Sequence, residues 1–137
     1  MFNKILIPLD FTDSDTQKRA LSIATDLAKS QGAELHAVSV GSSLPGATAR
    51  TEEERISHLD DVVASIHATY GIEAIAHEIH SVDPAAEIDK LLLQSIDDLN
   101  IDLVIMSSHV PGIMEYFFSA HAGYVASHAK VSVFVVR

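Results

Sequence analysis

The chain has 137 residues, of which 47% are hydrophobic and 20% charged, and its formal net charge is −10. This length predicts a single domain over residues 1–137, and the composition excludes a disordered chain. The absence of cysteine excludes disulfides and thiolate sites, the acidity disfavours nucleic acid, and no apolar run reaches the roughly 18 residues of a membrane helix. With no signal-peptide pattern at the N-terminus, we expect a cytoplasmic protein.

The first half of the chain predicts alternating strands and helices. An apolar run over residues 5–9 has the length of a strand covered on both faces. A helix with apolar spacing follows it and ends at Gly32. A second strand is expected over residues 35–40 and a loop over residues 42–50. Thr51 and Glu54 form a capping-box pattern that opens a second helix, with an apolar stripe of Ile56, Leu59, Val62, Val63, Ile66 and Tyr70.

The second half continues the alternation. A strand is expected over residues 72–79, and Asp83 with Pro84 predicts the start of a third helix, which Asn100 ends. A buried strand over residues 103–106 leads into a polar turn at residues 107–112. A fourth helix and a last strand over residues 131–136 close the chain. This order predicts an α/β three-layer sandwich around a five-stranded parallel sheet.

The turn at residues 107–112 is the first place to expect function. In open parallel sheets, ligands bind outside the carboxyl ends of the strands. This turn leaves the carboxyl end of a strand with two serines and a histidine, Ser107, Ser108 and His109. No Gly-x-Ser-x-Gly pattern surrounds the serines, so we interpret them as turn and cap residues and not as nucleophiles.

The eight histidines raise the question of a metal site. His121 and His128 lie seven residues apart on one helix, about 10 Å along its axis, which is too far to share an ion. His77 and His80 have opposite parity in a strand and point to opposite faces. We therefore predict no metal site and expect exposed or half-buried structural imidazoles.

The acids Asp10, Asp13 and Asp15 follow the first strand, as the magnesium-binding acids of response-regulator receiver domains do. Receiver domains also need an aspartate at the end of the third strand and a lysine at the end of the fifth. Here the third strand ends in Ile79, His80 and Ser81. We therefore interpret Asp13 and Asp15 as acids at a helix start.

Five short segments, taken together and in order, resemble the universal stress protein family. They are KILIPLD at residues 4–10, VSV at 38–40, DLVIMSSH at 102–109, YVASHA at 124–129 and VSVFVV at 131–136. Their spacing is similar to the branch with a shortened loop after the Ser-His pair. The resemblance implies an adenine-nucleotide alpha-hydrolase-like fold with sheet order 3-2-1-4-5, and a role in stress response that is not enzymatic.

The resemblance also implies an ATP or AMP site. Carried over to this sequence, Pro8, Leu9, Asp10 and Val40 surround adenine and ribose, and Met106 lies beneath the base. The phosphate-loop positions, in a pattern that has lost most of its glycines, are Ser107, His109, Val110, Gly112, Ser119 and Ala120.

The departures from the phosphate loop predict a weak grip on phosphate. Val110 is β-branched and Pro111 has no amide hydrogen, so the turn loses conformational freedom and a donor. Glu115 puts an anion where the helix dipole would otherwise favour phosphate. We expect weak binding through adenine and ribose, and not tight binding of the magnesium-bound triphosphate. The alternative is a protein-interaction module of the same fold without nucleotide. An ATP pyrophosphatase ranks last, because residues 9–14 lack the glycines of its turn.

The last strand, residues 131–136, is too apolar to leave exposed at a sheet edge. Sequence alone leaves two interpretations: an ordinary buried strand, or an edge that pairs with another chain. The resemblance implies the second, an antiparallel homodimer through this strand.

Overall fold

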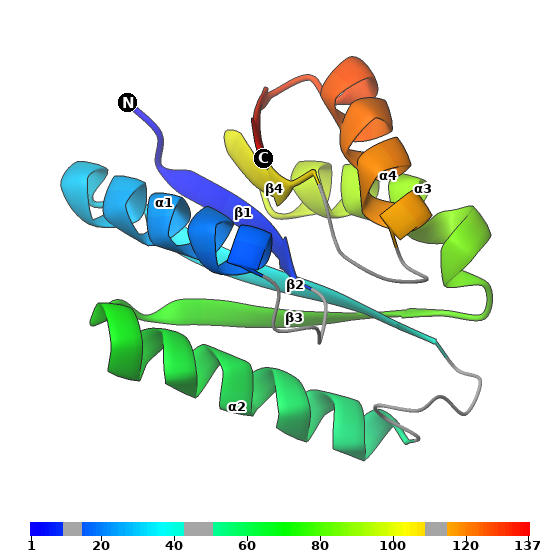
Figure 1. The fold of residues 1–137 in the computed structure, drawn as a ribbon, viewed down its shortest axis with the longest axis horizontal. Coiled ribbons are helices and arrows are strands. Elements are labelled where there is room, and N and C mark those ends of the chain that lie inside the picture. Colours follow the sequence, from blue (N-terminus) through cyan, green and yellow to red (C-terminus); the bar gives the residue numbers. More distant parts are fainter. Residues whose placement is uncertain (10–14, 43–50, 109–114) are drawn as a thin grey trace.

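The computed structural model describes residues 1–9, 15–42, 51–108 and 115–137. Five strands alternate with four helices along the chain (Figure 1). The strands are β1 (Lys4–Leu9), β2 (Glu34–Ser42), β3 (Ala74–Ser81), β4 (Leu103–Ser107) and β5 (Ser132–Val136). The helices are α1 (Asp15–Gln31), α2 (Glu52–Tyr70), α3 (Pro84–Asp98) and α4 (Glu115–His128).

All five strands lie in one parallel sheet with the order β3-β2-β1-β4-β5. Helices α1 and α2 pack on one face of the sheet, and α3 and α4 pack on the other. The predicted fold class and strand order are therefore confirmed. In the part of the chain that the structure describes, no helix combines the length and apolar character needed to cross a membrane.

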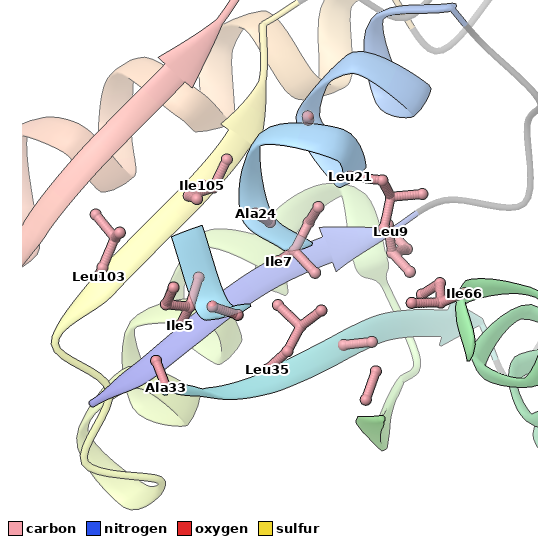
Figure 2. Packing of buried hydrophobic residues seen from close by; sticks show 14 of the residues in the cluster. Ile5, Ile7, Leu9, Leu21, Ala24, Ala33, Leu35, Ile66, Leu103 and Ile105 are labelled. Atoms are coloured by element: carbon pink, nitrogen blue, oxygen red, sulfur yellow. The ribbon is translucent and has the colours of Figure 1, made fainter. Parts of the chain in front are cut away.

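Strand β1 lies at the centre of both hydrophobic layers. Its Ile5 and Ile7 point towards α1, together with Leu35 from β2, whereas Leu6 points towards α3 and α4. Figure 2 shows the first layer, with Leu9 of β1 among the side chains of α1 and α2. The exposed fractions of Ile5, Leu6 and Ile7 are 0%, 0% and 1%. A strand covered on both faces needs an unbroken apolar run, which is what residues 5–9 provide.

The helix ends lie close to where the cap residues predict them. The Thr51 hydroxyl accepts from the Glu54 amide at 3.1 Å, and the Glu54 carboxylate accepts from the Thr51 amide at 3.0 Å, which completes the capping box. Asp83 caps α3 with Pro84 in its first turn. Gly71 ends α2 with a φ of 66°, a left-handed conformation that glycine adopts without a Cβ clash.

Some strand boundaries differ from the predictions. Strand β2 runs to Ser42, where the predicted loop begins, and β5 begins at Ser132 instead of residue 131. Strand β3 begins at Ala74 instead of residue 72, because pairing with β2 starts where Ala74 meets Leu35.

In α2, Ile56 is 43% exposed, although the apolar stripe included it, and the neighbouring Arg55 is only 3% exposed. Arg55 takes the inward position because Glu78 and His80 on β3 accept hydrogen bonds from its guanidinium.

The Asp102 carboxylate joins the beginnings of β1 and β4. It accepts hydrogen bonds from the Asn3 amide at 2.8 Å, the Asn3 side chain at 3.3 Å and the Lys4 amide at 3.0 Å. Burial raises the pKa of Asp102, but the bonds from Asn3 and Lys4 lower it more, so the pKa lies below its ordinary value. The ionised form is therefore the one that stabilises this junction.

We expect Asp102→Ala to lower the free energy of unfolding by about 1–3 kcal/mol at neutral pH, since two backbone amides lose a charged acceptor. The difference from wild type should shrink as the pH falls below the ordinary value of 3.8. Urea denaturation at several pH values measures it. Asp98→Ala, at an exposed position of α3, is the control; an equal loss in the two variants would contradict this role of Asp102.

Candidate functional site

The direction of the strand connections switches between β1 and β4. Both strands are central, but α1, which follows β1, packs on one face, and α4, which follows β4, packs on the other. The connections therefore leave the carboxyl ends of β1 and β4 in opposite directions. In sheets of this kind, ligands bind at this switch in connection direction.

The pairing of β1 changes along its length. Its register with β4 covers Ile5 and Leu6, whereas its register with β2 continues as far as Leu9 opposite Ser39. Pro8, which lacks a backbone donor, lies beyond the last residue that pairs with β4. A proline inside a central strand is otherwise rare; here it lies where one of the two ladders has already ended.

The residues expected around adenine fall on different faces. By strand alternation, Pro8 shares the face of Leu6, on which Met106 is 0% exposed among residues of α3 and α4. Leu9 packs on the other face with the α1 cluster, so its side chain points away from Pro8 and Met106. The backbone of Val40 pairs with Ile79 of β3. Asp10 lies outside the described residues.

The turn after β4 is tied to β5. Ser107 is 4% exposed and pairs with Val136, and the Ser108 amide donates to the Val136 carbonyl at 2.8 Å. That amide is therefore already engaged within the sheet. Ser119 and Ala120 lie within helix α4. The other expected phosphate-loop residues, His109, Val110 and Gly112, lie outside the described residues.

A buried cation that sequence reasoning missed lies between α2 and the end of β3. The Arg55 Nε donates to Glu78 Oε1 at 2.8 Å, and its Nη2 donates to His80 Nδ1 at 2.7 Å. The Arg55 and Glu78 side chains are 4% and 11% exposed. The spacing of Arg55 before Leu59 and Ile66 places it on the buried face of the helix, and this was the available signal.

A second missed cluster joins β2 and β3 on the opposite face. His36 Nδ1 lies 2.9 Å from His77 Nε2, and His36 Nε2 lies 3.2 Å from Glu34 Oε2. The pKa of His77 is lowered, first by burial and then by His36. The pKa of Glu34 is lowered by its hydrogen bond with His36 and by the charge of Lys4, whose Nζ lies 3.5 Å away.

The expectation of exposed or half-buried histidines was wrong at two positions. His36 is 4% exposed and His121 is 8% exposed. His121 Nδ1 lies 2.5 Å from Asp89 Oδ1, which joins α4 to α3. A polar partner compensates each burial. Over residues 1–9, 15–42, 51–108 and 115–137, no group of three or more histidine, aspartate or glutamate side chains is placed to hold a metal ion.

Comparison with known proteins gives a consistent result. The sequence pattern of the family described as "Universal stress protein family" matches residues 1–137. A universal stress protein from Archaeoglobus fulgidus is similar in structure, with a TM-score of 0.71 and 20% identity, and the match covers 100% of this chain and 95% of that one.

Two further structures are similar at the same level. The universal stress protein UspA from Lactobacillus plantarum has a TM-score of 0.69 and 19% identity, with 99% and 98% of the two chains covered. A universal stress protein from Archaeoglobus fulgidus in complex with dAMP has a TM-score of 0.68 and 22% identity, with the same coverage. At these identities the structures share the fold.

We expect Arg55→Met to lower the free energy of unfolding by about 3–5 kcal/mol, because it leaves the buried Glu78 carboxylate without its cation. The double variant Arg55→Met/Glu78→Met should recover much of this loss, since it removes both charges. Urea denaturation of the four proteins in this cycle gives the coupling energy. Lys90→Met, at an exposed position of α3, should change little. Independent, additive losses at Arg55 and Glu78 would contradict the pairing.

Proposed function

This chain belongs to the universal stress protein family, and from that premise we propose that residues 1–137 form one cytoplasmic regulatory domain that binds an adenine nucleotide and pairs with a second copy. The observation that carries the nucleotide site is the end of β1–β4 pairing before Pro8, at the switch in connection direction. A shared fold with a relative that is complexed with dAMP supports the choice of adenine.

The proposed site binds the nucleoside more strongly than the phosphates. The proposed place of the purine ring is beside the apolar carboxyl end of β4, where Met106 is itself covered at 0% exposure, and apolar surroundings suit such a ring. On the phosphate side, the Ser108 amide already donates to the Val136 carbonyl, and proline at position 111 has no amide hydrogen to donate. Helix α1, which starts at this end of the sheet, begins with the acid Asp15, which competes with phosphate for the positive end of the helix dipole.

The same arguments favour a role in binding over a role in catalysis. Phosphoryl transfer needs an arginine or metal clamp on the transferred group. Arg55 is a buried cation, but Glu78 and His80 already occupy two of its donor nitrogens. We therefore propose that nucleotide acts on this protein as a bound regulator.

Calorimetric titration with adenosine, AMP and ATP, each with and without Mg²⁺, tests the site. We expect adenosine and AMP to bind within about tenfold of ATP, with no gain from Mg²⁺, because the phosphates contribute little. Guanosine monophosphate is the base control. The variant Val110→Gly/Pro111→Gly should tighten ATP more than AMP, since it restores an amide and backbone freedom. Val82→Gly, at a residue 71% exposed, is its control.

Two results would contradict this proposal. Magnesium-dependent binding of ATP, roughly 100-fold tighter than AMP, would mean that the turn grips phosphate. No heat with any adenine compound at millimolar concentration would favour the alternative, a protein-interaction module of this fold without nucleotide.

Strand β5 supports the proposed pairing. It is one edge of the sheet, and its side chains alternate between exposed and half-buried, with Phe134 44% exposed. An edge strand with free backbone groups and apolar side chains is a template for another strand. A two-fold axis between two copies of β5 would join them antiparallel, as an isologous interface.

We expect the wild-type protein to be a dimer at micromolar concentration and Phe134→Asp to be a monomer, because a carboxylate would be buried at the proposed interface. Size-exclusion chromatography with light scattering measures the mass of each. Ile75→Asp is the matched control: Ile75 is 45% exposed on β3, the opposite edge, and this variant should remain dimeric. A monomeric wild type, or loss of the dimer in both variants, would contradict the proposal that β5 forms the dimer interface.

A further inference from the structure

Strand β3 is the other edge of the sheet, and it lacks the usual protection of an edge. It pairs with β2 along eight positions without a break in register, from Ala74 opposite Leu35 to Ser81 opposite Ser42. Among the described residues, no strand pairs with its other side. Proteins commonly protect an edge with lysine, proline, a bulge or a short strand. The segment AIAHEIHS contains neither lysine nor proline, and it pairs over its full length without a bulge.

Helix α2 runs along β3 and covers only one of its faces (Figure 1). On that face, the one acid of the strand, Glu78, is 11% exposed and is paired with Arg55, so its charge is already compensated. Ile75 lies on the opposite face by strand alternation, and there it is 45% exposed. A strand added at this edge would therefore find unpaired backbone groups next to an exposed apolar side chain.

The negative charge of the protein is concentrated around this edge. Residues 51–89, which form α2, β3 and the start of α3, contain ten acidic residues and one basic residue, Arg55. With histidine counted as neutral, this segment carries nine of the ten net negative charges. The rest of the chain contains nine acidic and eight basic residues, so its charges are nearly balanced.

Exposed acids lie near both ends of β3. Helix α2 runs antiparallel to the strand, because Arg55 near its start contacts His80 near the end of the strand. The exposed Glu52 and Glu53 lie within one helical turn of Arg55, near the carboxyl end of β3. The Glu73 side chain, directly before the strand, is 81% exposed. Negative charge therefore flanks the edge at its beginning and at its end.

This charge decides which kind of chain the edge can accept. A second copy of β3 would bring the same acids against each other, and like charges facing across paired strands are destabilising. Nucleic acid and anionic membranes are repelled for the same reason. An extended segment in which basic and apolar residues alternate would place cations beside the acids and an apolar side chain beside Ile75.

We propose that β3 is a docking edge for an extended basic segment of another protein, which joins the sheet as an additional strand. In strand addition of this kind, main-chain hydrogen bonds supply affinity and side chains supply specificity. The acids around the edge would select a basic partner and speed its association. This use of the edge requires neither a bound nucleotide nor the pairing of β5.

Fluorescence anisotropy of a labelled peptide, in which lysine and valine alternate over the eight residues of a strand as long as β3, tests the proposal. We expect the full chain to bind it with a Kd of about 1–100 μM, and several-fold more weakly in about 0.5 M salt, which screens surface charge. A peptide with glutamate in place of lysine should not bind. A lysine–valine peptide with N-methylated amides keeps its charge but cannot donate to a ladder, and it should not bind either.

Three variants test the place of binding. Glu53→Gln/Glu73→Gln should weaken binding of the lysine–valine peptide roughly three- to tenfold, because it removes two charges beside the edge. Its matched control, Asp26→Asn/Asp98→Asn, removes two exposed charges from α1 and α3 and should bind as wild type does. Ile75→Lys should weaken binding at least as much as the first variant, since it replaces the apolar contact with a cation.

Hydrogen–deuterium exchange locates the bound peptide. Amides of residues 74–81 should gain protection when the lysine–valine peptide is added, and amides of β5 should not. Absence of binding at millimolar peptide, protection at β5 instead of β3, equal binding of the glutamate or N-methylated peptide, or equal weakening in the two double variants would overturn the proposal. Assembly of the protein alone beyond a dimer, if Ile75→Lys prevents it, would also overturn it, because a second copy would then occupy this edge.

Discussion

The burial of β1 on both faces is the constraint on which the rest of the structure depends. Ile5, Leu6 and Ile7 are at most 1% exposed, and each fully buried side chain of this kind contributes about 1.5–3 kcal/mol. That burial requires helices on both faces, so the connections on the two sides of β1 must run to opposite faces. The switch in connection direction at its carboxyl end is a geometric consequence of this arrangement.

Most of the architecture could be predicted because local signals and tertiary packing agree. The capping box at Thr51 and the Asp83–Pro84 pair begin their helices, and Gly71 ends α2, all through contacts between residues a few positions apart. The inward face of α2 was harder. Hydrophobicity favours Ile56 over Arg55, and partners distant in the chain, Glu78 and His80, which lie 23 and 25 residues later, reverse that preference. The burial of His36 similarly depends on His77, which lies 41 residues away.

The predicted site likewise has features that the local sequence predicts and features that depend on tertiary packing. The position of Pro8 near the switch in connection direction follows from the strand order, and the burial of Met106 follows from the apolar run of β4. The side-chain direction of Leu9 follows only from the pairing of β1, which turns it towards α1. Three histidine-containing contacts now join separate elements: β2 to β3, α2 to β3, and α3 to α4. Buried polar pairs of this kind add little net stability, but each fits one relative position of the two elements.

The hydrogen bond from the Ser108 amide to the Val136 carbonyl has a consequence for how the turn after β4 is coupled to the outer edge of the sheet. It fastens the start of the turn after β4 to the final residues of β5, so that a displacement of either one must move or break the other. A ligand that shifts Ser108 would therefore alter the shape of the outer edge. By thermodynamic reciprocity, whatever clamps that edge would change the affinity for the ligand by the same factor.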